Sequence, residues 1–173
     1  MMNSINVMFP DLETERMDLR ILTLEHSEQV YQHFSDCHVT KFMDIEPCRD
    51  IKEAEEIIRY HEEDSGCRWG LFDKGNGNFL GTIGFHYIRR NQVVIAEIGF
   101  DLSKAHWGKG FMTEAMKKAM AFGFREAGFD TIDATVEPEN GKSLQLLRKL
   151  GFHEDKEPKD GLIYFYIEKE KMA

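Results

Sequence analysis

The sequence has few cysteines and no long apolar run. Its three cysteines, Cys37, Cys48 and Cys67, are an odd number without metal-like spacing, so we expect free thiols and no disulfide framework. No apolar stretch approaches the roughly 20 residues of a membrane-spanning helix, and the first residues lack the basic and apolar parts of a secretory signal. These absences predict a cytoplasmic protein without a membrane partner.

Metal-binding patterns and clusters of positive charge are also missing. The seven histidines include no His-x-x-x-His pair, so we expect no metal site. The net charge is −9, which disfavours a nucleic-acid partner because neutralising phosphates requires clustered Lys and Arg. The same charge gives a weak bias towards a cationic substrate.

The composition is that of a globular chain. Hydrophobic residues make up 42% of 173 residues, enough for a substantial core, so we expect residues 1–173 to form a single domain. We expect strands over 14–22, 67–73, 79–88, 93–102, 131–136 and 162–168, and helices over 24–34, 50–64 and 143–150, with a further long helix inside 106–130. The stretch 35–47 is irregular, with one turn of helix at most.

The long helix is the clearest element. Apolar or small residues recur there at the spacing of one buried helical face: Met112, Ala115, Met116, Ala119, Met120 and Gly123. Because this helix separates strands 93–102 and 131–136, we expect the two strands to be parallel. The fold class is therefore a mixed α/β sheet with helices on both faces and a ligand crevice at the carboxyl end of the parallel pair. Gly99 is expected at a bulge or at a close backbone approach.

Gly108 and Gly110 stand directly before the long helix. They carry no side chains and can adopt positive φ, which leaves backbone N–H groups exposed. At a helix N-terminus such amides bind anions, so residues Gly108 to Met112 predict a phosphate or pyrophosphate site. An ordinary glycine turn is the alternative, and Gly-Lys-Gly by itself favours that alternative.

Three stretches together resemble the GNAT superfamily of N-acetyltransferases. They are Ala96 to Leu102, His106 to Ala115, and Asn140 to Phe152, within a resemblance that covers Phe79 to Phe152. Within the superfamily the chain is most similar to the branch that acetylates N-terminal residues of ribosomal proteins. Ala105 departs from the pattern, because the superfamily often has Gln or Arg there.

The resemblance implies acetyl-CoA as co-substrate and a splayed strand whose freed amides meet the acyl carbonyl and the pantetheine arm. Asn140 is expected at the pantetheine arm, as a helix N-cap, or as both. Trp107 either shields the cofactor or fills a gap beside the loop. The expected cofactor-binding residues are Phe100, Asp101, Leu102, Trp107, Gly108, Lys109, Gly110, Phe111, Met112 and Asn140.

Two residues are expected to act in catalysis. Only a neutral amine attacks a thioester, so a carboxylate that removes the proton helps, and Glu97 stands at the family position on an otherwise apolar strand face. A solvent-facing structural glutamate is the alternative. Leu147 replaces the tyrosine acid of many GNAT enzymes, whereas Ser143 matches the serine that donates to the coenzyme sulfur in the ribosomal branch. A local backbone hydrogen bond is the alternative role of Ser143.

The resemblance favours a protein or peptide N-terminal α-amine as acceptor. A polyamine or small-amine acetyltransferase and a non-catalytic acyl-CoA sensor are the alternatives. Acidic residues in the early helical region could serve a polyamine, although such charges are usually solvated: Glu46, Glu53, Glu62, Glu63 and Asp64. A monomer and a homodimer stay open, as does gating of the acceptor site by residues 35–49.

Overall fold

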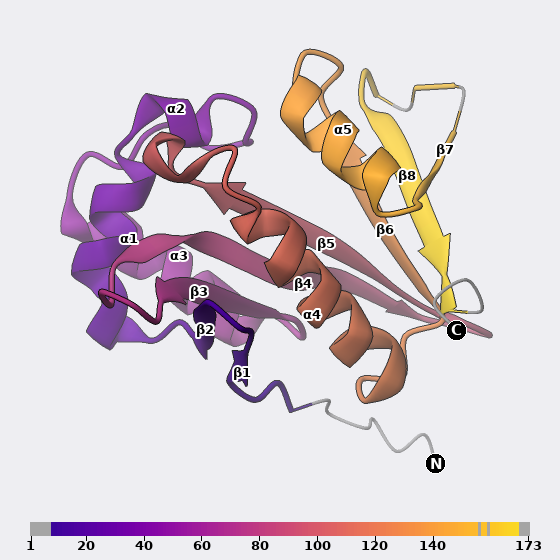
Figure 1. Cartoon of the computed structure of the whole chain (residues 1–173), viewed down its shortest axis with the longest axis horizontal. Coiled ribbons are helices and arrows are strands. Elements are labelled where there is room, and N and C mark those ends of the chain that lie inside the picture. The colour runs from indigo at the N-terminus through magenta and orange to yellow at the C-terminus, as the bar shows by residue number, and fades with distance from the viewer. Residues whose placement is uncertain (1–7, 156, 159, 170–173) are drawn as a thin grey trace.

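The computed structural model describes residues 8–155, 157–158 and 160–169. Within these residues, one eight-stranded sheet has the order β1-β2-β3-β4-β5-β6-β8-β7. The pairing is antiparallel except between β5 and β6, which are parallel as expected (Figure 1). The strands are β1 (Leu12–Glu13), β2 (Met17–Ile21), β3 (Cys67–Asp73), β4 (Phe79–Arg90), β5 (Val94–Leu102), β6 (Thr131–Val136), β7 (His153–Glu154) and β8 (Ile163–Glu168).

Polar side chains fix the starts of several helices. Thr23 accepts from the amide of Glu25, Asp50 from Glu53, and Asn140 from Ser143, so each satisfies a free amide of a first helical turn. The expected cap of Asn140 is therefore present. The helices are η1 (Leu24–His26), α1 (Ser27–Phe34), α2 (Cys37–Thr40), α3 (Ile51–Glu63), η2 (Lys104–His106), α4 (Phe111–Arg125) and α5 (Gly141–Lys149).

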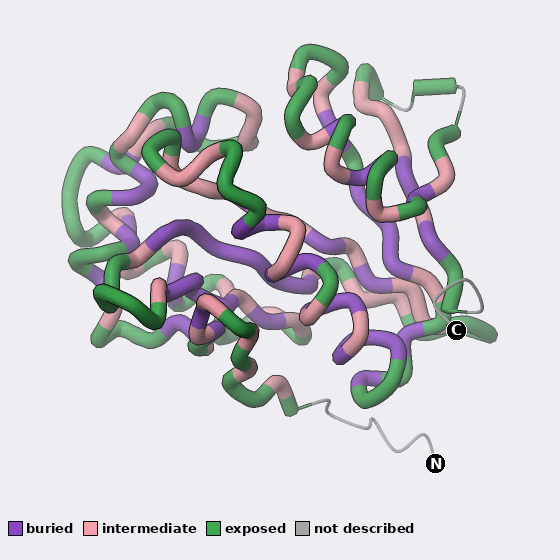
Figure 2. The backbone as a smooth tube through the Cα atoms, in the orientation of Figure 1, coloured by how far each residue is buried: buried purple, intermediate pink, exposed green. Residues whose placement is uncertain are grey.

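Helices cover both faces of the sheet, as the apolar patterns predicted (Figure 1). On one face α4 and α5 share a core cluster with the sheet, and the whole expected stripe from Met112 to Gly123 is buried. On the other face α1, α2 and α3 form a second cluster with Leu22 and Phe79. Figure 2 shows the buried residues running along the central strands between these layers.

The parallel strands separate towards their carboxyl ends. Pairing between β5 and β6 ends at Glu97 opposite Asp133, after which β5 stays paired with β4 and β6 with β8. A gap therefore opens in the sheet where the sequence predicted a crevice. The expected alternative of a bulge at Gly99 is wrong, because Gly99 pairs in regular register with Gly84. The irregularity lies on β4 instead, between His86 and Arg89, where Tyr87 has φ of 47°.

The described residues form no helix that combines the length and the apolar character needed to cross a membrane. The cytoplasmic location stays a prediction.

Candidate active site

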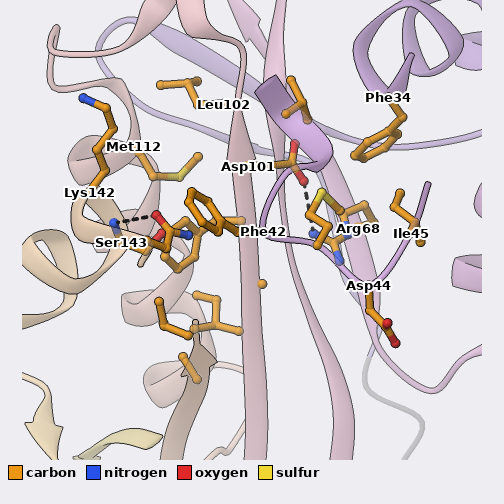
Figure 3. Close-up of a pocket in the computed structure, with 18 of the residues that line it drawn as sticks. Phe34, Phe42, Asp44, Ile45, Arg68, Asp101, Leu102, Met112, Lys142 and Ser143 are labelled. Carbon is orange, nitrogen blue, oxygen red and sulfur yellow. Dashed lines mark hydrogen bonds and ion pairs between the residues drawn. The ribbon is translucent and has the colours of Figure 1, made fainter. Parts of the chain in front are cut away.

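A cavity of about 1410 Å³ begins in the gap between β5 and β6 and extends to α3 (Figure 3). We call residues 99–102, 107–112 and 140–143 its cofactor half. Residues 42–46, the inward residues of α3, Arg68, His86 and Glu97 are its acceptor half. The structure brings every predicted site residue to this cavity except Lys109.

The glycine loop of the cofactor half has the geometry of an anion site. Gly108 and Gly110 adopt φ of 75° and 79°, and Gly110 is the N-cap of α4. Within the described chain, the amides of residues 108–110 donate to no protein acceptor. They are followed by the first turn of a 15-residue helix, whose amides and dipole favour a phosphate.

Arg16 holds this loop in place, a role that no sequence motif indicated. Its Nη1 donates to the Lys109 carbonyl at 2.9 Å and its Nε to Glu114 at 2.9 Å, while its guanidinium lies 4.3 Å from the centre of the Phe111 ring. The Lys109 carbonyl thus binds Arg16, the residue directly before β2, and Lys109 does not line the cavity. The loop is prepared before any ligand arrives, which lowers the entropic cost of binding.

Trp107 connects the glycine loop to the strands and helix on either side of the gap. Its Nε1 donates to the Leu102 carbonyl at 2.8 Å, and the Lys142 ammonium lies 4.9 Å from the centre of its ring. Lys142 lines the cavity and adds positive charge near the glycine loop. The indole therefore links β5, the loop and α5 around the expected path of the cofactor.

The carboxylate of Asp101 is committed to protein contacts. It is 8% exposed and accepts hydrogen bonds from the Thr82 amide at 3.1 Å and hydroxyl at 2.7 Å, with His33 Nε2 at 2.5 Å. Burial by itself would raise the pKa of Asp101, but His33, Arg68 and Thr82 together lower it. What Asp101 offers a cofactor is its backbone, beside the half-buried Phe100 and Leu102.

Ser143 stands in the first turn of α5 and lines the cavity. Its amide donates to Asn140 Oδ1 at 3.3 Å, the dashed line beside Ser143 in Figure 3. Its hydroxyl makes no hydrogen bond to the described residues, so the local bond considered as its alternative role is not formed. Leu147 is fully buried in the core, which places the usual tyrosine position away from solvent here.

Glu97 has a partner that the sequence analysis missed. Its Oε1 lies 3.1 Å from His86 Nε2, and the two side chains are 25% and 29% exposed at the cavity. His86 faces Glu97 because the β4 irregularity at Tyr87 sets the register of the two strands. The buried Nδ1 of His86 has no partner among the described residues. A carboxylate joined to an imidazole can hold and pass a proton.

Two further polar residues form the floor of the acceptor half. Desolvation, followed by the positive charges of Arg68 and His86, lowers the pKa of His61 to about 3, so this imidazole is neutral near pH 7. Arg68 carries a buried guanidinium whose side chain is 10% exposed. Carboxylates line the outer part of the acceptor half: Asp44, Glu46, Glu53, Glu56 and Asp64. Glu62 and Glu63, also considered from the sequence, do not line the cavity.

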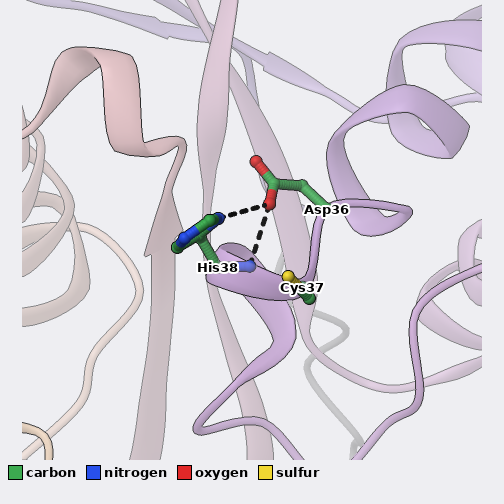
Figure 4. A group of neighbouring side chains, drawn as sticks. All are labelled: Asp36, Cys37 and His38. Atoms are coloured by element: carbon green, nitrogen blue, oxygen red, sulfur yellow. Dashed lines mark hydrogen bonds and ion pairs between the residues drawn. The ribbon is translucent and has the colours of Figure 1, made fainter.

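One exposed group on α2 has the atom types of a metal site. The ligand atoms of Asp36, Cys37 and His38 lie within 4.8 Å of one another (Figure 4). The Asp36 carboxylate already caps α2 by accepting from the His38 amide at 2.8 Å. Helix capping accounts for this arrangement, and the absence of a metal from the reaction stays a prediction.

The chain is similar to known acetyltransferases over most of its length. The acetyltransferase (GNAT) domain model matches residues 16–153. An uncharacterised N-acetyltransferase, p20 of Bacillus licheniformis, is 39% identical over 159 residues, covering 90% of this chain and 86% of that protein. The ribosomal protein uS5 alanine N-acetyltransferase of Escherichia coli is 30% identical over 107 residues, covering 62% of this chain and 55% of that protein.

A solved structure shows the same fold. The spermidine N-acetyltransferase of Vibrio cholerae, in complex with CoA and spermine, superposes with a TM-score of 0.78 at 22% identity. The match covers 90% of this chain and 97% of that one.

Proposed function

The chain belongs to the GNAT family of acetyltransferases, and we propose that its acceptor is the α-amino group of a protein or peptide N-terminus. As a GNAT N-acetyltransferase it uses acetyl-CoA and an amine. The observation that carries the choice of acceptor is the size and continuity of the cavity, about 1410 Å³. Small-molecule sites usually measure about 300–1,000 Å³, so the whole cavity exceeds the usual size for one small ligand, which supports a site shared by the pantetheine arm and the first residues of a peptide.

In this proposal acetyl-CoA binds the cofactor half. The amides of residues 108–112 and the N-terminus of α4 hold its pyrophosphate, with Lys142 nearby. The pantetheine arm follows the unpaired edge of residues 99–102 into the gap, which brings the thioester next to Gly99. The acceptor amine enters from the opposite half and meets the thioester beside Glu97.

Glu97 removes the amine proton, directly or through a water, and His86 orients the carboxylate. The amine nitrogen then forms a bond to the acetyl carbon, the carbon–sulfur bond breaks, and the second proton of the nitrogen passes to the departing sulfur, so that coenzyme A leaves as the thiol. The free hydroxyl of Ser143 donates a hydrogen bond to that sulfur. An α-amine has a pKa of about 7.7–8.0, so it needs less help from a base than a lysine at about 10.4.

The test is a thiol-release assay with acetyl-CoA and a panel of acceptors: N-terminal peptides, free amino acids, spermidine and peptides whose single amine is a lysine side chain. We expect the highest kcat/KM with an N-terminal peptide. A kcat/KM for spermidine well above that of every peptide would overturn the choice of acceptor. No turnover with any amine would identify an acyl-CoA sensor.

A polyamine acceptor is the second candidate, and the carboxylates that line the outer part of the acceptor half support it. Asp44, Glu46, Glu56 and Asp64 line the outer acceptor half together with Glu53. Multiple carboxylates attract and hold a linear polycation. Glu53 is already paired with Arg49 at 2.9 Å, however, and the floor of the same half carries the cation Arg68. That cation opposes an ammonium group placed deep in the cavity.

A further inference from the structure

We propose that Arg68 binds a carboxylate of the acceptor, namely an Asp or Glu side chain at the first or second position of the peptide. This inference rests on the proposed peptide acceptor and adds a sequence preference to it. The contacts among the described residues do not account for the full hydrogen-bonding capacity of Arg68, and its position beside the reaction centre limits which part of a peptide can reach it.

The guanidinium of Arg68 is incompletely paired. A guanidinium has five N–H donors, yet the hydrogen bonds among described residues include one from Arg68, from Nη1 to the Thr82 hydroxyl at 3.3 Å. Its nearest carboxylate oxygen, on Asp101, is 4.0 Å away, beyond hydrogen-bonding distance. The Arg68 Nε is buried and has no partner among the described residues, so the donors that a ligand in the cavity can reach are those of the two terminal nitrogens. Leaving donors of a buried cation unsatisfied is costly, so a ligand that satisfies them binds strongly.

Asp101 cannot move to fill this role without losing other contacts. Its two oxygens already serve the amide and hydroxyl of Thr82 and the ring of His33. Figure 3 shows Arg68 and Asp101 side by side at the cavity, joined by the long ion pair. A carboxylate of a bound ligand can supply the acceptors that the described residues do not, because it matches the planar guanidinium donors in two parallel bonds.

Arg68 lies close to the expected thioester. A Cβ added to Gly99 would stand 3.4 Å and 3.5 Å from the two terminal nitrogens of Arg68. Glu97 is two residues before Gly99 on the same strand face, about 7 Å away at the usual rise of a strand. The distance between an amine at Glu97 and an anion at Arg68 is then roughly the distance, within a peptide, from the α-amine to the side chain of its first or second residue.

The outer carboxylates add a second preference, which concerns the peptide residues that follow the acidic one. A peptide that places an acid on Arg68 next passes Asp44, Glu46 and Asp64 on its way out of the cavity. Neutral or basic residues are favoured there, since further acids meet like charge. The acceptor half therefore selects a peptide with one acid next to its amine and no acids in the following positions.

The test compares matched peptides with Asp or Asn in the second position, Ala-Asp-Lys-Tyr-amide and Ala-Asn-Lys-Tyr-amide, by kcat/KM. The Lys ε-amine of each peptide is acetyl-blocked, so that the α-amine is the acceptor. We expect wild type to prefer the Asp peptide by roughly 10- to 100-fold, the range for hydrogen bonds to a charged group. In Arg68→Gln the preference falls to within about 2-fold, because the Asp peptide loses more kcat/KM than the Asn peptide. Arg90→Gln, which removes an exposed arginine outside the cavity, keeps the full preference.

Each other outcome overturns the inference. Equal turnover of both peptides by the wild-type enzyme overturns the inference. This comparison needs no variant, so it stays decisive even if Arg68→Gln fails to fold. A preference for Asp that persists in Arg68→Gln also overturns it, as does an equal loss with both peptides, which would place Arg68 at the reacting carbonyl or in the fold. Spermidine turnover without peptide turnover instead contradicts the proposed function, and the two failures are thereby distinguished.

Discussion

The two halves of the cavity are built by different means. The cofactor half consists mainly of backbone: a glycine loop, a helix N-terminus and the edge of a strand released from its neighbour. The acceptor half consists of side chains from α3, β3, β4 and β5 that meet through packing of the whole sheet. Changes of backbone conformation should therefore disable the first half, and changes of single polar groups should disable the second.

This difference also explains why the two halves of the cavity tolerate side-chain substitutions to different extents. Phosphate recognition by amides depends on φ and on the start of a helix, and many side chains are compatible with it. Recognition of an acceptor depends on which charges face the cavity, such as Arg68 and Glu97. Proteins similar to this chain bear the names of acetyltransferases for different acceptors, a ribosomal protein and spermidine.

The largest effect is expected in the acceptor half, from Glu97→Gln. We expect kcat/KM to fall by about 10²- to 10⁴-fold and the acidic limb of the pH–rate profile to disappear, because no base removes the amine proton. Acetyl-CoA affinity should stay the same. Steady-state kinetics across pH check this, with Glu62→Gln on the outer side of α3 as control. An unchanged pH–rate profile would assign Glu97 a structural role.

The next effect is expected in the cofactor half, from Gly110→Val. A β-branched residue is strained at φ of 79°, so the loop is expected to shift, whereas the added Cβ alone would make an ordinary contact 3.4 Å from Arg16 Nη2. Calorimetric titration should show acetyl-CoA binding weakened by about 1–3 kcal/mol. Gly77→Val is the matched control, since Gly77 has φ of 74° in a turn outside the cavity. Equal affinity in the Gly110 variant and wild type would refute the phosphate site.

A smaller effect is expected where the halves meet, from Ser143→Ala. Losing a hydrogen bond to the departing sulfur should lower kcat by about 10-fold and leave acetyl-CoA affinity unchanged. Ser65→Ala, at an exposed turn, serves as the control. If the Ser143 variant changes affinity alone, the serine is a binding group.

The backbone geometry of the cofactor half was predicted because its signals lie within short stretches of the sequence. The buried stripe of α4, the positive φ of Gly108 and Gly110, and the parallel pair all follow from spacing within one stretch of chain. The two-residue strands β1 and β7 were not predicted, since such short strands depend on their partners. Their position follows from packing.

For the acceptor half, the sequence analysis named Glu97 and the carboxylates Glu46, Glu53 and Asp64 among residues that line the cavity. The position of His86, the partner of Glu97, depends on the strand register that Tyr87 shifts, and that irregularity is absent from the hydrophobic pattern. Arg68 reaches Gly99 across an intervening strand, a distance no local motif encodes. Gly99 was interpreted as a possible bulge because glycine serves both purposes, and here its missing side chain leaves room for His86 and Arg68.

The smallest effect concerns stability. The pKa of His61 is about 3 in the folded protein and about 6.5 when unfolded, so the unfolded state binds a proton first as pH falls. This group therefore supports stability above pH 6.5, and its contribution is lost progressively down to about pH 3. In His61→Asn, the drop in Tm between pH 7.5 and 5 should be smaller by a few degrees. The exposed His38→Asn should keep the wild-type drop.

The most direct measurement is a competition, read by mass spectrometry. Equal concentrations of spermidine and of a peptide with a free N-terminus and an internal lysine share limiting acetyl-CoA and the enzyme. We predict that the acetyl group is found on the peptide, and that fragmentation places it on the α-amine. Acetylation of spermidine or of the lysine side chain in preference to the α-amine would contradict the account.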